Sequence, residues 1–151
     1  MRAKSFVVTA VAAILMAVSN GCRNEADQKV EQAMKSNQVA FQSNRGDPIV
    51  LSKAQGDEVK RLVQLFGNHS DVRVEREMLG FKYGEFILGE QRFSWQGEML
   101  YFRDENGRWH IVESPILGKL TDAYMKAHGT PPLQAPSLDQ WKEILALLTK
   151  E

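Results

Sequence analysis

The chain has 151 residues, with 19 basic and 19 acidic side chains, a formal net charge of zero and one cysteine. The basic residues form no block along the chain, so nucleic acid, which proteins bind through positive charge along its phosphates, is not an expected partner. A lone cysteine excludes an internal disulfide, and a chain of this length can form a single domain whose core needs neither disulfides nor metals.

The first 22 residues follow the order of an export signal. Arg2 and Lys4 precede an apolar run of 13 residues at 6–18, and three small or polar residues then lead to Cys22. This run is too short for a permanent membrane-spanning helix, which needs roughly 20 apolar residues. Removal of residues 1–21 takes away Arg2 and Lys4 and no acid, which leaves 17 basic and 19 acidic residues and a net charge of −2.

The same segment resembles the signal peptide of a bacterial lipoprotein. In that family a Gly or Ala precedes an invariant cysteine, which is acylated with fatty acids such as palmitate and becomes the first residue after cleavage. Gly21 and Cys22 match these two positions, whereas Ser19 and Asn20 differ from the large aliphatic and the small residue of the family pattern. The resemblance covers residues 1–22 and implies a cell-envelope protein anchored to a membrane by lipid on Cys22, where two acyl chains suffice for stable attachment.

Two other interpretations of this segment stay open. Ala17-Val18-Ser19 has the small-x-small form of an ordinary secretory cleavage site, which would release a soluble secreted or periplasmic protein. Without any cleavage, the segment would act as a hydrophobic anchor. Lipidation is favoured because an unpaired cysteine in an exported chain needs a reason, and Cys22 directly follows the signal.

The rest of the chain divides into a polar segment at 22–47 and a globular domain at 48–151. Val30, Met34 and Phe41 are sparse apolar residues at helical spacing in the first of these. Such a thin stripe predicts either a loosely docked helix or a flexible tether. A Gly-Asp-Pro sequence then ends the segment.

Strand and helix patterns follow each other at the start of the domain. The apolar run 49–51 predicts a short strand. Residues 52–66 predict a helix, because apolar side chains recur there at i, i+3, i+4 and i+7. Ser52 and Gln55 have the spacing of a capping box at its N-terminus.

Over residues 71–114 the apolar side chains change from helical spacing to alternation, which predicts four consecutive antiparallel strands. They are expected at 72–78, 85–95, 98–103 and 108–113. Gly89 is expected to kink the second strand through a bulge, and Asn106-Gly107 favours a hairpin loop. One face of such a meander is expected to be covered by helices and the other to be exposed to solvent.

Two further helices are predicted after the strands. Apolar residues from Leu117 to Ala127 line the first helix, and Ser137 with Gln140 forms a capping box at the start of the second. The second helix has an apolar stripe made of Leu138, Trp141, Ile144, Leu145 and Leu148. The predicted fold is therefore a single α+β domain, a four-stranded antiparallel meander packed with flanking helices.

The sequence contains no motif that is typical of an enzyme or a metal site. His69, His110 and His128 lie far apart and have no second histidine at metal-ligand spacing, so neither a metal nor another cofactor is predicted. Serine-hydrolase and phosphate-binding loop motifs are absent. His110 is expected on the solvent face of the last strand, and His69 in a turn.

Aromatic residues are concentrated in the predicted sheet, where residues 81–109 hold 8 of the 13 aromatic side chains. Neighbouring positions on a strand face opposite sides, so Tyr101 and Phe102 cannot both lie under the helices. Core packing accounts for most of these rings, but a ring exposed on the sheet could stack on a sugar or hold a peptide. Trp95 and Tyr101 are therefore the candidate ligand-binding residues.

These patterns favour a lipid-anchored, non-enzymatic envelope protein that binds or scaffolds a partner, either another envelope protein or a glycan. The alternative is a small exported hydrolase that uses His110 or His69 with a carboxylate within about 3.2 Å. A third hypothesis is a purely structural component of a larger envelope complex.

Overall fold

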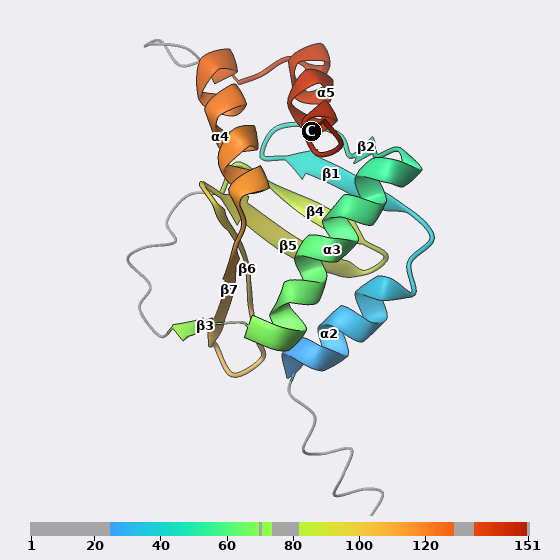
Figure 1. The fold of residues 1–151 in the computed structure, drawn as a ribbon, viewed down its shortest axis with the longest axis vertical. Coiled ribbons are helices and arrows are strands. Elements are labelled where there is room, and N and C mark those ends of the chain that lie inside the picture. The colour runs from blue at the N-terminus through green and yellow to red at the C-terminus, as the bar shows by residue number, and fades with distance from the viewer. Residues whose placement is uncertain (1–24, 70, 74–81, 129–134, 151) are drawn as a thin grey trace, which may run out of the picture.

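The computed structural model describes residues 25–69, 71–73, 82–128 and 135–150. The helices of this part of the chain are α2 (Glu25–Met34), α3 (Lys53–His69), α4 (Pro115–His128) and α5 (Leu138–Ala146). Its strands are β1 (Val39–Ser43), β2 (Ile49–Val50), β3 (Asp71–Arg73), β4 (Gly84–Leu88), β5 (Gln91–Gln96), β6 (Met99–Arg103) and β7 (Trp109–Glu113). Figure 1 shows how the helices pack against the sheet. The predicted signal and Cys22 lie outside the described residues.

The strands form one antiparallel sheet in the order β2-β1-β4-β5-β6-β7-β3. Six of these strands have at least three residues, and β2 has two. The prediction of a single α+β domain is confirmed, whereas the prediction of a four-stranded sheet is wrong. The meander β4-β5-β6-β7 is extended by β1 and β2 at one edge and by β3 at the other.

The first difference from the predicted sheet is at Gly89. The range 85–95 is not one kinked strand, because the chain reverses there and Leu88 pairs with Gln91. Gly89 has φ +64°, a conformation that glycine adopts without a steric penalty and that two-residue hairpin loops require. The glycine therefore makes a hairpin and not a bulge. The predicted hairpin loop at Asn106-Gly107 is confirmed, with Gly107 at φ +79°.

The second difference concerns the strand predicted at 72–78. Its described part, β3, pairs with β7 and places Val72 opposite His110. A simple meander would put this strand beside the range 85–95, but β3 lies at the other edge of the meander. Residues 74–81 of the prediction lie outside the described part of the chain.

The described part of the range 22–47 is packed into the domain. Ala26 and Ala33 of α2 are fully buried, and so is Phe41 of β1. The helical spacing that includes Phe41 is therefore wrong, since this residue lies in a strand between β2 and β4. Buried alanines add little to an apolar pattern, which is why the sequence predicts only a thin stripe for a closely packed helix.

A row of aromatic rings crosses the helix-covered face of the sheet on five neighbouring strands. Phe41 is opposite Phe86, and Phe86 is opposite Phe93. Phe93 meets Phe102 edge to face, with 5.8 Å between ring centroids. Phe102 is in turn opposite His110. This aromatic row is the centre of the core, and rings in such contact add about 0.5–1.5 kcal/mol per pair beyond the burial of their surface.

Helices α3 and α5 pack directly on the aromatic row. Phe66 of α3 lies 5.0 Å from Phe102, and Trp141 of α5 lies 4.9 Å from Phe41, both between ring centroids. The four side chains are buried. Because each helix inserts a large ring, its apolar face is fixed against a particular part of the sheet.

Both predicted capping boxes are present. Gln55 N donates to Ser52 Oγ at 3.2 Å, and Ser52 N donates to Gln55 Oε1 at 2.9 Å. Ser137 and Gln140 form the same reciprocal pair at the start of α5. Leu138, which the sequence assigns to the buried stripe of α5, is instead 57% exposed.

The opposite face of the sheet carries a smaller apolar cluster. Tyr101 and Ile111 are opposite each other and buried, and Met99 and Trp109 pack against them. This face is therefore not uniformly polar, in contrast to the expectation of a wet outer face.

Candidate functional site

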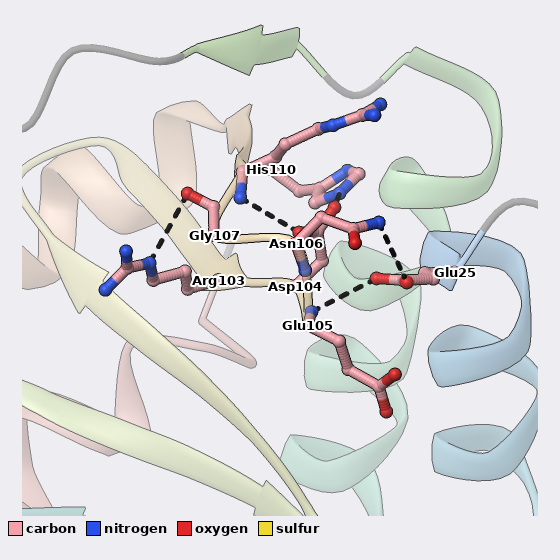
Figure 2. Close-up of polar contacts among 8 residues, drawn as sticks. Glu25, Arg103, Asp104, Glu105, Asn106, Gly107 and His110 are labelled. Carbon is pink, nitrogen blue, oxygen red and sulfur yellow. Dashed lines mark hydrogen bonds and ion pairs between the residues drawn. The ribbon is translucent and has the colours of Figure 1, made fainter.

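The β6–β7 hairpin brings a histidine and a carboxylate together. Asp104 Oδ2 and His110 Nε2 lie 2.9 Å apart, and Figure 2 shows this pair among the polar contacts around it. The backbone N–H groups of Asn106 and Arg108 donate to Asp104 Oδ1, each at 2.9 Å. An aspartate that accepts from its own loop fixes the turn. Asp104 therefore closes the hairpin loop and holds the imidazole at the same time.

His110 is 2% exposed, so the prediction that it faces solvent is wrong. The sequence takes Trp109 and Ile111 as the core-facing pair of β7, but these side chains belong to the smaller cluster on the opposite face. His110 occupies the last position of the aromatic row, and its ring stacks on Phe102 at 4.7 Å and 7°. The register with neighbouring strands, which the sequence does not reveal, decides which face is covered.

Burial limits what the pair can do chemically. The distance meets the requirement of the predicted hydrolase, but the side chains of His110 and Asp104 are only 3% and 5% exposed. A general base must reach the proton that it removes from a substrate. In this arrangement the pair joins the hairpin loop to the core, and little of its surface is open to a substrate.

The pKa of Asp104 lies below its ordinary value. Burial alone would raise this pKa, but the hydrogen bonds with His110 and with the backbone of Arg108 and Asn106 outweigh that effect by stabilising the charged form. The carboxylate is therefore ionised at neutral pH. On the other side of the ring, His110 Nδ1 is buried and has no hydrogen-bond partner among the described residues.

The first residue of α2 completes this end of the molecule. Glu25 accepts from the backbone N–H of Glu105 at 3.2 Å and from Asn106 Nδ2 at 3.4 Å. An acidic residue in the first turn also interacts favourably with the helix dipole. The start of α2 and the hairpin loop are thus held together (Figure 2).

The other two histidines are each the last residue of a helix. His69 is the last residue of α3, and its side chain is not among those that the structure describes. His128 lies in the last turn of α4, where its ring stacks on Tyr124 at 5.1 Å. Within the described ranges, no group of three or more His, Cys, Asp or Glu residues is arranged to hold a metal ion.

A cleft of about 650 Å³ lies among the β1–β2 loop, α4 and α5. Residues 43–49, from the end of β1 to the start of β2, form part of its wall. The rings of Tyr83, Tyr124 and Trp141 also contribute to its lining. The remaining lining residues are His128, Ala135, Pro136 and Leu138. The exposed side chain of Leu138 is thus part of the cleft wall, which accounts for its absence from the core.

The rings of the cleft are packed against one another. Tyr83 stacks on Tyr124 with 4.3 Å between centroids and an angle of 27°, and Tyr124 lies 5.5 Å from Trp141. Burial raises the pKa of Tyr124, and the neighbouring Tyr83 raises it further. The Tyr124 hydroxyl is therefore neutral at physiological pH. The stacking holds these rings in place, and a preorganised surface lowers the entropy cost of binding a ligand.

The rim of the cleft is polar and charged. Residues 44–48 are exposed, and they include Arg45 and Asp47. Asn44 Nδ2 donates to Lys82 O at 2.5 Å, and Gln42 Nε2 donates to Gly46 O at 3.3 Å. The loop is therefore fixed at its base while opposite charges stand at the mouth of the cleft.

Neither of the predicted ligand-binding aromatics lines the cleft. Trp95 is fully buried below it, 5.2 Å from Tyr83, and donates from Nε1 to Gly97 O at 2.9 Å. Tyr101 is 4% exposed on the opposite face of the sheet. Both are packing residues in this structure. The sequence assigns Tyr124 and Trp141 to helix stripes, and only the tertiary arrangement reveals that these stripes end at a cleft.

No protein-family model, curated protein or solved structure matches this chain. No helix in the described part of the chain is long and apolar enough to cross a membrane.

Proposed function

We propose that the chain is a lipid-anchored, non-enzymatic envelope protein that binds a glycan in the cleft between the β1–β2 loop, α4 and α5. The observation that carries the binding role is the combination of a charged rim with the partly exposed ring of Tyr83, which stacks on the buried ring of Tyr124 in the same lining. The anchoring role is supported by the sequence, through the export signal that ends at Gly21-Cys22.

The lining fits the chemistry of a sugar. Aromatic rings pack against the apolar C–H face of a pyranose, while carboxylate, guanidinium and amide groups bind its hydroxyls. The cleft supplies both, since its lining includes the partly exposed ring of Tyr83 and the exposed side chains of Asn44, Arg45 and Asp47. Its volume of about 650 Å³ lies within the usual range of ligand pockets.

The binding role can be tested by isothermal titration of the chain with oligosaccharides of N-acetylglucosamine and with soluble fragments of bacterial cell-wall glycan. Tyr83→Ala removes a ring from the lining, and we expect about a tenfold loss of affinity, since one aromatic contact contributes roughly 1–1.5 kcal/mol. Trp109→Phe, in the cluster on the opposite face, is the matched control and should bind as the wild type does. Equal affinity for both variants, or no binding of any glycan, would contradict the proposal.

The anchoring role can be tested by metabolic labelling with a fatty acid. We expect the label on the wild-type chain and its loss in Cys22→Ser. An unlabelled mature protein that begins at Asn20 would instead support ordinary secretion.

The hydrolase that uses His110 is the second candidate, and one observation favours it, the 2.9 Å distance from His110 to Asp104. The burial of both side chains opposes it. Hydrolysis of an activated ester that His110→Phe abolishes, in a variant that still folds, would support this candidate over the first.

A further inference from the structure

We propose that the protein is held with its β6–β7 hairpin loop towards the anchoring membrane and with its cleft directed away from it, so that the glycan reaches the cleft from the aqueous side. This orientation rests on the lipidation of Cys22 proposed above. It follows from the short length of chain between Cys22 and the folded domain.

Only three residue steps separate Cys22 from Glu25, the first residue of α2. An extended chain spans at most about 3.6 Å per residue, so the lipid-bearing residue lies within about 11 Å of Glu25. The carboxylate of Glu25 is itself bonded to Glu105 and Asn106 of the hairpin loop. The attachment point is therefore close to the β6–β7 loop.

Helix α2 is fixed along its length and cannot serve as an extension of the tether. Ala26 and Ala33 are fully buried. Lys29 Nζ lies 5.0 Å from the ring centroids of both Phe93 and Phe102 and donates to Gln91 Oε1 at 3.2 Å. A cation placed over two rings and hydrogen-bonded at the same time is a specific contact, and it holds the helix to the sheet.

The cleft lies at the opposite ends of the same strands. Ser43 is paired with Gly84, and Gly84 with Trp95, at the end where the cleft forms. The pairs at the other end are Leu88 with Gln91 and Arg103 with Trp109. Five residues of strand span about 17 Å. Figure 1 shows the start of α2 and the helices α4 and α5 towards opposite ends of the longest axis.

This orientation favours a ligand from the aqueous compartment over a lipid of the anchoring membrane. A lipid of the anchoring leaflet would meet the β6–β7 hairpin, whose Arg103, Glu105 and Arg108 are exposed and charged, before it could meet the cleft. A glycan in the aqueous compartment, on a polymer or free, meets the cleft directly. The anchor thus faces the membrane, and the binding site faces the aqueous compartment.

The orientation can be measured with a fluorescent probe at each end of the lipidated chain. Glu105→Cys places a probe on the hairpin loop, and Asp139→Cys places one on α5 beside the cleft. Both side chains are exposed, and the sulfur of an acylated Cys22 is not available for labelling. The chains are reconstituted in vesicles of phosphatidylethanolamine and phosphatidylglycerol that contain a lipid spin-labelled at its headgroup. We expect the headgroup label to quench the probe at 105 at least about twofold and to leave the probe at 139 nearly unchanged, because quenching is short-ranged and the two ends lie about 17 Å or more apart.

A longer tether provides the matched control. Ten Gly and Ser residues inserted between Asn24 and Glu25 add roughly 17 Å of root-mean-square reach, so quenching at 105 should fall while the chain still floats with the vesicles. Equal quenching at both positions, or stronger quenching at 139, would overturn the orientation and leave the anchoring intact. A wild-type chain that carries no acyl group and does not float with the vesicles would remove the anchoring itself, which is a distinguishable result.

Discussion

The two ends of the sheet are built in different ways. At the β6–β7 end, Asp104 is bonded to two backbone N–H groups and to His110, and Glu25 accepts two more hydrogen bonds from the same loop. At the cleft end, Arg45 and Asp47 are exposed beside stacked rings. Polar groups that satisfy one another fix a fold, whereas exposed polar groups on a supported loop are available for a ligand. The β6–β7 end therefore serves stability, whereas the rim of the cleft is where we propose that a ligand binds.

Gly84 tests how far this contrast extends, because it lies at the cleft end but in the core. A Cβ at this position would overlap Cζ of Phe41 and lie 2.7 Å from the carbonyl oxygen of Gln42. We expect Gly84→Ala to lower the free energy of unfolding by about 3 kcal/mol, because the ring and the neighbouring strand would both have to move. Urea denaturation measures this change.

Gly67→Ala is the matched control for Gly84→Ala. Its Cβ would meet Asp27 Oδ1 at 3.5 Å, an ordinary contact, so replacement of a helical glycine should raise the free energy of unfolding by about 0.5–1 kcal/mol. Similar effects of the two substitutions would show that the core below the cleft is not rigid.

The rim of the cleft should differ from both glycine positions. We expect Arg45→Ala to change the free energy of unfolding by less than about 0.5 kcal/mol.

The sequence predicts the local features of this molecule well. The capping boxes at Ser52 and Ser137, the hairpin at Asn106-Gly107 and the apolar faces of α3 and α4 depend on residues close together in the chain. These features need no knowledge of the partner elements, since capping and turn formation involve neighbouring residues.

The sequence does not predict the features that depend on strand order. β1 and β3 join the sheet at positions that no local pattern specifies, and His110 is buried because its register continues the aromatic row. The cleft is assembled from the β1–β2 loop, Tyr83 and two helices that are distant in the chain. Alternation along one strand identifies two faces, but only the neighbouring strands decide which face is covered.

The β6–β7 end should lose stability when the Asp104 carboxylate is removed. Asp104→Ala leaves two backbone N–H groups and the buried imidazole of His110 without their acceptor, and we expect a loss of about 2 kcal/mol in the free energy of unfolding. His110→Phe continues the aromatic row and should have a smaller effect.

The double variant Asp104→Ala/His110→Phe separates the effect of losing the Asp104 acceptor from the effect of leaving the His110 imidazole unpaired. It should be more stable than Asp104→Ala alone, by about 1 kcal/mol, because the buried imidazole that lacks a partner is gone. Additive effects of the two single substitutions would mean that the pair is not coupled.

Acid should weaken the β6–β7 end of the sheet. The pKa of Asp104 is held below its ordinary value in the folded state by hydrogen bonds that outweigh burial, so its ionised form contributes stability above pH ~4, where the unfolded-state carboxyl is also ionised. That contribution is lost as the pH falls through the lower, folded-state pKa. Asp104→Asn keeps the shape of the side chain and cannot titrate, so the difference in urea midpoint between the wild type and this variant should be larger at pH 5 than at pH 3. Glu85, whose pKa is also lowered because Lys82 and Arg92 outweigh its burial, titrates in both proteins and cancels in the difference. A difference that stays constant over this range would mean that the Asp104 carboxylate does not support the hairpin through its charge, and the contrast between the two ends would then rest on packing alone.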